Sequence, residues 1–187
     1  MKESAARTRI LDVASRLFYE QGYNSTGINQ IIDEANIARG SLYKHFESKR
    51  DLLTAYIQKA AESYFTELDK FLAPIKDPKQ KLLAFFDYRL ERQIRSNFGG
   101  CEFIKISAEV PKNDLKAFEL IREQKDRLRI YIKKLIHQID LSKTSALTKE
   151  MLADMLFLIL EGSTVTASVY KDVEAIKNAK KIIKKLI

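Results

Sequence analysis

A short stretch of the chain is rich in side chains that can donate hydrogen bonds, and no acid lies among them. The donors are Arg39, Ser41, Tyr43, Lys44 and His45. If residues 39–45 form a helix, Leu42 and Phe46 are four apart and share its apolar underside. A short helix with one apolar edge and a donor-rich outer face suits the major groove of double-stranded DNA.

The residues before this stretch have the pattern needed to position it. Four apolar residues recur at helical spacing: Ile28, Ile31, Ile32 and Ala35. We expect the Thr26 hydroxyl to cap this helix by accepting a bond from a free backbone amide. Asn36 follows, and Asn tolerates the left-handed backbone angles of a tight turn. The sequence therefore predicts two short helices joined by a turn over residues 26–46.

Residues 7–53 resemble the N-terminal DNA-binding domain of the TetR family of bacterial transcriptional repressors. The match includes LFYEQGY at 17–23, the helix-turn-helix, GSLYKHF at 40–46 and SKRDLL at 48–53, in all roughly a quarter of the chain. The resemblance implies a DNA-binding domain over residues 1–50, with its motif at about 26–46. It implies that residues 51–187 bind a ligand and dimerise.

The resemblance also implies how each residue would meet DNA. Phosphate contacts are implied for Thr26, Tyr43, His45 and Lys49. Contacts to base edges are implied mainly for Arg39, Gly40, Ser41 and Lys44. The physical logic agrees, because phosphate contacts fix the register whereas Arg or Lys reaching guanine gives sequence choice. Ala38 departs from the family, which usually has a capping Ser or Thr there.

The rest of the chain also reads as helix, which predicts an all-α protein of about nine helices: a three-helix DNA-binding domain followed by a helical bundle. The further helices are expected over residues 4–21, 48–72, 77–95, 101–110, 113–139, 148–170 and 172–187. Ser48 and Asp51 form a capping box, and Asp77 precedes Pro78 at a helix start. The helix over 48–72 would link the two domains, and we expect it alone to transmit a push between their sites directly.

The two C-terminal helices carry more apolar side chains than one chain needs. These are Met151, Leu152, Met155, Leu156, Leu158, Ile159, Val165, Ile176, Ile183 and Leu186. In the family the matching helices pair into a four-helix interface. A two-fold homodimer through residues 148–170 and 172–187 is therefore implied.

Aromatic side chains in the helical remainder are mostly expected in the core, and the resemblance implies that some line an effector cavity. The candidates for ligand binding are Tyr64, Phe85, Tyr88, Phe98, Cys101, Phe103, Phe118, Phe157 and Glu161. Glu161 lies in an apolar stretch, where an acid needs a partner. It is either an interhelical ion pair or dimer-edge charge, or a pocket acid that selects cationic ligands.

Cys101 is the only cysteine, so no disulfide can form within the chain and a reducing compartment is expected. One interpretation is a buried structural thiol. The other is a sensor of oxidants or electrophiles, since the residue follows Gly99 and Gly100 where a helix is expected to begin. Residues 100–105 resemble the Gly-Cys element of a TetR subgroup, some of whose members sense electrophiles.

Composition limits the remaining possibilities. The net charge of +8 suits a nucleic-acid partner, although residues 1–50 contribute only +2 of it. No secretory signal is visible, and the longest apolar run, 155–160, is far too short to span a bilayer. The sequence contains no phosphate-binding loop, no metal-ligand cluster and no nucleophile motif, so we expect no cofactor and no enzyme activity.

The sequence therefore predicts a cytoplasmic, DNA-binding transcriptional regulator. We expect a repressor that a small-molecule effector releases from its operator. One alternative is a regulator that responds to oxidants or electrophiles through Cys101. Another is an orphan regulator that has no small ligand.

Overall fold

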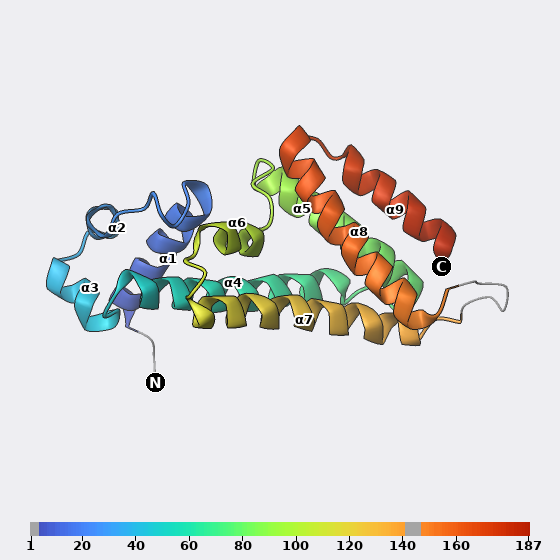
Figure 1. Ribbon diagram of the computed structural model, residues 1–187, viewed down its shortest axis with the longest axis horizontal. Coiled ribbons are helices and arrows are strands. Elements are labelled where there is room, and N and C mark those ends of the chain that lie inside the picture. The colour runs from blue at the N-terminus through green and yellow to red at the C-terminus, as the bar shows by residue number, and fades with distance from the viewer. Residues whose placement is uncertain (1–3, 141–146) are drawn as a thin grey trace. The chain divides into compact units, whose positions relative to one another are not determined.

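The computed structural model describes residues 4–140 and 147–187, and all regular structure in those ranges is helical (Figure 1). The helices are α1 (Ala5–Glu20), α2 (Ile28–Ala35), α3 (Arg39–His45), α4 (Lys49–Leu72), α5 (Pro78–Arg95), α6 (Glu102–Glu109), α7 (Leu115–His137), α8 (Lys149–Tyr170) and α9 (Glu174–Leu186). This confirms the predicted fold class. The predicted helices over 4–139 and 148–187 are all present.

Backbone contacts divide the chain into two compact units. The first unit contains the residues up to Ser63 together with Glu102–Arg122, and the second contains Tyr64–Cys101 and Glu123–Ile187. The chain thus passes between the units at three places: inside α4, at the Cys101–Glu102 bond and inside α7. The expectation that α4 alone can carry a signal directly is therefore wrong, because α7 also spans both units and the chain crosses again just before α6.

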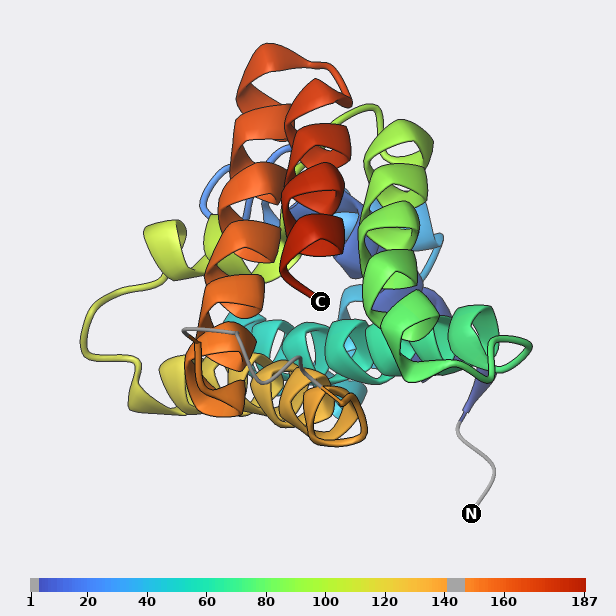
Figure 2. The same ribbon diagram turned by 90° about the vertical axis from the view of Figure 1, so that its right-hand side faces the viewer.

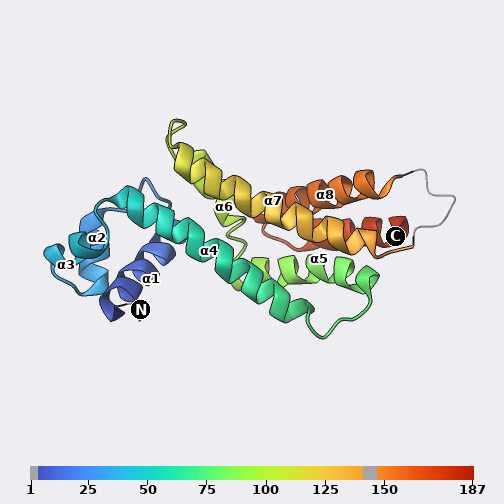
Figure 3. The same cartoon turned by 90° about the horizontal axis from the view of Figure 1, so that it is seen from below.

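In the first unit, α1, α2 and α3 pack on one another, as Figures 1 and 3 show. Helix α1 buries a stripe made of Ile10, Leu11, Ala14, Leu17 and Phe18. The Phe18 ring meets the rings of Tyr23 and Tyr56 edge-on, at 5.3 and 5.6 Å between ring centres. Helix α3 joins this core through Leu42, which is fully buried.

Helix caps follow the sequence with one exception. Ser48 and Asp51 form the predicted capping box, and Asp77 accepts a bond from the Gln80 amide. Asn36 adopts the left-handed conformation expected of the turn, with φ of 50°. Thr26, however, does not cap α2: the N-cap residue is Gly27, and no side chain caps the helix.

A second set of polar contacts fixes the loops of the first unit. Asn24 donates its backbone N–H to the Glu109 carboxylate at 2.9 Å and its side-chain amide to the Glu109 carbonyl at 3.1 Å. Arg50 donates two bonds to Asp114, at 2.9 and 2.8 Å. Gly22 has φ of +94°, and a side chain there would lie 2.6 Å from the Glu109 carboxylate. The segment after α6 is therefore bonded to residues of the N-terminal helical domain.

In the second unit, α5, α8 and α9 lie side by side, as Figure 2 shows. Their apolar faces merge into one core with the C-terminal part of α4 and with α7. The largest fully buried side chains of this core include Phe65, Leu68, Phe85, Phe86 and Leu72. This core positions the polar residues described below.

Helix α8 is long and apolar enough, by length and composition, to cross a membrane. The longest uninterrupted apolar run, 155–160, is only a part of this helix, so the run alone did not predict it. A core helix of a soluble protein meets the same test, so one such helix is weak support for a membrane span. In this fold α8 packs on α5 and α9, and its Glu161 forms ion pairs.

The Arg50–Asp114 pair yields a prediction about stability. The bonds from Arg50 hold the pKa of the Asp114 carboxyl below its usual value, and the Ala117 amide adds to this. Because the Arg50 side chain is 59% exposed, Asp114→Asn should cost only about 1 kcal/mol at neutral pH.

The sign of the pH dependence follows from the lowered pKa. The stabilisation is present above the unfolded-state pKa of about 4 and is lost as pH falls through the folded-state value. Urea unfolding of wild type and Asp114→Asn at pH 7 and in mild acid should therefore show a difference that shrinks in acid. A difference that does not change with pH would mean that the carboxylate charge is not what stabilises the loop.

Candidate DNA interface and ion cluster

The donor-bearing face of α3 points away from the core of the first unit. Arg39, Lys44 and Tyr43 are exposed, the last at 44% of its surface, whereas Ser41 and His45 are half-buried. Fully buried Leu42 anchors the opposite face. The predicted arrangement of a short helix with an apolar underside is therefore present.

Two contacts hold the ends of this face in place. Arg39 donates a hydrogen bond from Nη2 to the Asn29 side-chain oxygen of α2 at 2.6 Å. The His45 Nε2 lies 3.2 Å from the hydroxyl of Ser4, the residue that caps α1. Both partners belong to neighbouring helices of the first unit, so packing of the three helices also orients the donors.

The fold of the described residues does not require glycine at position 40. Apart from its chain neighbours and the backbone of its own helix, no described atom lies within 4 Å of the position that a side-chain carbon would occupy, and φ is not in the left-handed region. Glycine inside a helix costs about 0.5–1 kcal/mol relative to alanine. The missing side chain therefore leaves room for a close approach from outside the chain. Ala38 is the N-cap residue of α3, and its methyl side chain cannot accept a capping hydrogen bond.

Two of the predicted phosphate contacts are less available than the sequence suggested. Thr26 is only 1% exposed, and its hydroxyl donates to the Gly22 carbonyl at 2.7 Å. This hydrogen bond holds the loop between α1 and α2. The Lys49 ammonium lies 4.3 Å above the Tyr23 ring, and burial lowers the pKa of Lys49, opposed by nearby Glu109.

The structure places the predicted ligand-binding residues in both units. Phe103 and Phe118 lie in the first unit, and the others lie in the second. Tyr64 and Tyr88 are buried together with their ring centres 5.5 Å apart. Phe85 packs instead against Tyr131, and half-buried Phe157 lies 5.5 Å beneath the guanidinium of Arg129. Half-buried Phe98 adopts a left-handed conformation in the loop after α5.

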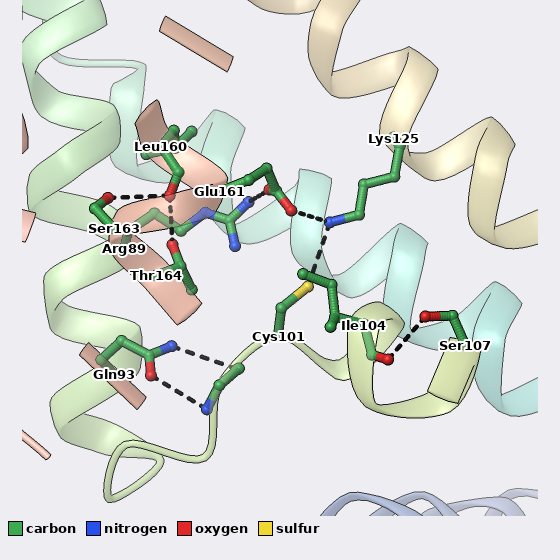
Figure 4. A network of polar contacts seen from close by, with 11 residues as sticks. Arg89, Gln93, Cys101, Ile104, Ser107, Lys125, Leu160, Glu161, Ser163 and Thr164 are labelled. Atoms are coloured by element: carbon green, nitrogen blue, oxygen red, sulfur yellow. Dashed lines mark hydrogen bonds and ion pairs between the residues drawn. The ribbon is translucent and has the colours of Figure 1, made fainter. Parts of the chain in front are cut away.

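Glu161 and Cys101 meet in a group of charged residues that Figure 4 shows. We call Arg89, Lys125, Glu161 and Cys101 the ion cluster. Arg89 of α5 donates to the Glu161 carboxylate at 2.8 Å, and Lys125 of α7 donates to its other oxygen. Lys125 also lies 3.4 Å from the Cys101 sulfur. The interhelical ion pair considered for Glu161 is therefore formed.

The charges around Glu161 decide its ionisation. Burial alone would raise the pKa of this carboxyl, but the positive charges of Arg89 and Lys125 outweigh burial and hold the pKa below its usual value. Glu161 is thus a carboxylate at neutral pH. Its negative charge is paired with two cations of the same chain, Arg89 and Lys125.

Arg89 and Lys125 are not among the site residues that the sequence predicted. A signal for Arg89 exists, because it follows Phe85 and Phe86 by four and three residues and so shares the buried stripe of α5. Gln93 lies on the same stripe and brackets Gly100: it accepts from the Gly100 N–H at 3.2 Å and donates to the Gly100 carbonyl at 3.4 Å (Figure 4). The backbone directly before Cys101 is held by these bonds.

A surface pocket of about 350 Å³ lies between the C-terminal part of α4 and α5. Its lining consists of Glu67, Lys70, Phe71, Tyr88, Glu91, Arg92 and Arg95. Arg92 and Arg95 both donate to Glu67. Of the predicted ligand-binding residues, Tyr88 alone belongs to this lining.

Comparison with known proteins identifies the N-terminal region. Residues 10–56 match the model of the family described as bacterial regulatory proteins, tetR family. The chain is 35% identical over 116 residues to the transcriptional regulator AcrR of Shigella flexneri, which covers 55% of this chain and 54% of that protein. It is 34% identical over 82 residues to the transcriptional repressor KstR2 of Rhodococcus jostii, which covers 44% and 40%. The chain spans about half the length of these relatives or less.

The fold of the whole chain also has known counterparts. A transcriptional regulator from Saccharomonospora viridis, solved in complex with choline, superposes with a TM-score of 0.84 over 97% of both chains, at 22% identity. The likeness at this identity concerns the fold. The match of residues 10–56 assigns this N-terminal region to the TetR family of bacterial regulatory proteins, and the whole-chain likeness adds a shared fold.

Proposed function

We propose that this protein binds operator DNA through α3 and represses transcription until a small effector releases it. The observation that carries the proposal is the exposed, acid-free donor face of α3, anchored by buried Leu42. The open space beside Gly40 supports it, because glycine there lets the helix approach another backbone. The relative from Rhodococcus jostii is named a repressor. Such a protein acts where the chromosome lies, which places it in the cytoplasm.

The donors of α3, together with Lys49 at the start of α4, divide by what they can recognise. Arg39 and Lys44 are long and exposed, so they reach base edges, where Arg or Lys prefers guanine. Tyr43 offers a hydroxyl and Lys49 a point charge, and we assign both to phosphates. His45 and Ser41 complete the contact surface.

This division predicts different outcomes for two pairs of variants. Arg39→Ala and Lys44→Ala should relax base preference, with about 1–3 kcal/mol lost on the cognate site. Tyr43→Phe and Lys49→Ala should weaken binding to every sequence alike, and Lys49→Ala should also reduce the salt dependence. The measurement is titration of each variant with cognate and scrambled duplexes at several salt concentrations. If Lys49→Ala alters base preference more than Lys44→Ala does, the assignment of roles is wrong.

Operator binding through two recognition helices needs a dimer. Several residues predicted for its interface are instead buried within the chain, namely Leu152, Leu156, Ile176 and Ile183. A stripe along α8 remains exposed: Met151 at 52%, Leu158 at 66%, Val165 at 40% and Val169 at 70%. Gly162 lies on the same helix with open space beside it. We infer that α8 pairs with its copy along this stripe and that α9 flanks it.

A homodimer would present two copies of α3 to successive major grooves, about 34–36 Å apart. Leu158→Asp should place a charge in the interface and shift the protein toward monomer, because an unpaired buried charge is costly. Light scattering at micromolar concentration measures the mass. Ile94→Asp is the matched control, since Ile94 on α5 is similarly exposed at 57% and should tolerate the charge. A monomeric wild type, or equal masses for the two variants, would refute this interface.

An effector releases the protein from DNA if it binds the DNA-free state more tightly than the DNA-bound state. A ligand that prefers the DNA-free state by about 100-fold shifts the equilibrium by about 2.7 kcal/mol per site. The second unit, with its buried Tyr64 and Tyr88 and its ion cluster, is where we place that ligand. An orphan regulator would bind the same operator and respond to no small molecule.

The alternative route to release from the operator is modification of the Cys101 thiol by an oxidant or an electrophile. One observation favours it: the Lys125 ammonium lies 3.4 Å from the sulfur. The thiol is only 8% exposed, however, which limits access of a reagent. We therefore expect wild type and Cys101→Ser to release operator equally after treatment with hypochlorite or a mild electrophile, as measured by fluorescence anisotropy of labelled duplex. Release that is lost only in Cys101→Ser would make the thiol the trigger.

A further inference from the structure

One of the two residues assigned to base edges is held in place by a second helix. Arg39 is the first residue of α3, and its Nη2 donates a hydrogen bond to the side-chain oxygen of Asn29 in α2 at 2.6 Å. Lys44, the other residue assigned to bases, forms no side-chain hydrogen bond or ion pair within the described part of the chain. The protein therefore restrains Arg39 and leaves Lys44 unrestrained.

The stability of the fold does not account for the bond between Arg39 and Asn29. Both side chains are exposed, and a hydrogen bond between exposed groups contributes little because water competes for the same partners. Arg39 also lies at the positive end of the helix dipole, where a cation is unfavourable, and no side chain caps α3 there. An arginine at this position costs stability, so its use is expected outside the chain.

The partner of Arg39 is a neutral amide, which suits a surface that faces DNA. Every polar hydrogen of a guanidinium is a donor, so only the oxygen of the Asn29 amide can accept this bond. An amide oxygen leaves the positive charge of arginine uncompensated. A carboxylate at position 29 would offset that charge and would repel phosphates. Asn29 thus restrains the side chain and keeps its full attraction to DNA.

The bond to Asn29 leaves Arg39 able to read a base. A guanidinium has two pairs of parallel donors: Nε–H with one hydrogen of Nη2, and one hydrogen of Nη1 with the other hydrogen of Nη2. Asn29 accepts one bond from Nη2, so it uses one hydrogen and interrupts one pair. The other pair stays complete. Such a pair bonds the O6 and N7 atoms of guanine.

We propose that Asn29 is a positioning residue that makes Arg39 selective for guanine. It holds the guanidinium in place before DNA binds, so less side-chain entropy is lost when a guanine is contacted. It also keeps Arg39 from turning to a phosphate, a contact that every sequence offers. Both effects raise the ratio of cognate to non-cognate affinity. The inference rests on the proposed binding of DNA by α3 and adds a residue of α2 to sequence selection.

The test measures base preference of the full chain with a library of randomised DNA duplexes. Wild type defines the preferred site, and Arg39→Ala identifies the base pair at which guanine is no longer favoured. Asn29→Ala should lower the preference for guanine at that same pair by about threefold to tenfold, the range expected from ordering one long side chain on binding. Affinity for duplexes that lack this guanine should stay the same or rise. The preference at the pair read by Lys44 should not change.

Two further variants are matched controls. Asn29→Asp keeps the acceptor and adds a charge, so it should retain the preference for guanine and bind every duplex more weakly. Gln30, the next residue, bonds Gln21 at 2.7 Å and Glu34 at 3.0 Å, and neither belongs to α3. Gln30→Ala should therefore leave base preference unchanged. Alanine is the best helix former, so Asn29→Ala should fold, which thermal melting verifies.

A double variant separates positioning from direct contact. In the Arg39→Ala background, Asn29→Ala should cause no further loss of preference, because Asn29 acts only through Arg39. Equal losses in both backgrounds would mean that Asn29 contacts DNA by itself and would overturn the proposal. A uniform drop in affinity for all duplexes in Asn29→Ala would overturn it too, since a purely structural bridge predicts that result. Loss of guanine preference in Asn29→Asp would show that the acceptor is not what matters.

The two levels of inference fail differently. If wild type has no sequence preference, or if Arg39→Ala leaves that preference intact, the role given to Arg39 is wrong and the role of Asn29 is refuted with it. If Arg39→Ala relaxes the preference and Asn29→Ala does not, the proposed function stands and only the positioning role is refuted.

Discussion

The candidate DNA interface depends on the burial of one side chain, Leu42. Helix α3 has seven residues, which is too short to be stable alone in water. Leu42 is fully buried and Phe46, just after the helix, is 3% exposed. Burial of these two side chains both stabilises α3 and fixes which of its faces points to the core. Because residues one and two apart do not share a helical face, anchoring Leu42 turns Tyr43 and Lys44 toward solvent.

Local signals in the sequence predicted the fold well because their physical causes are local. A capping box needs residues three apart, and the Ser48–Asp51 box, the Asp77 cap and the Asn36 turn all formed. Thr26 failed because a threonine hydroxyl before a helix has two local uses, and here it donates backward to Gly22. Local signals could not predict the ion cluster, because Glu161 lies 72 residues from Arg89 and 36 from Lys125 in the sequence. Only the tertiary fold brings such charges together.

Three glycines separate positions where the fold requires glycine from positions where it does not. Gly22 is required by the fold, since its φ is +94° and Glu109 fills the space of a side chain. Among the described residues nothing requires glycine at positions 40 and 162, and glycine inside a helix is destabilising relative to alanine. One lies on the donor face of α3 and the other on α8 with its exposed apolar stripe. The contacts proposed above, with DNA at α3 and with a second copy of the chain at α8, would explain why glycine is present at both positions.

The ion cluster follows the same logic in the protein interior. A core selected for stability alone would fill this place with apolar side chains, because replacing a buried ion pair with packed hydrophobic residues is often neutral or stabilising. Here the chain keeps Arg89 and Lys125 paired with one buried carboxylate beside Cys101, which is followed directly by Glu102 of the first unit. This cluster therefore lies one peptide bond from α6. Glu109, at the other end of α6, is hydrogen-bonded to Asn24, so the path from the cluster to the loop before α2 consists of the eight residues of α6 and these hydrogen bonds.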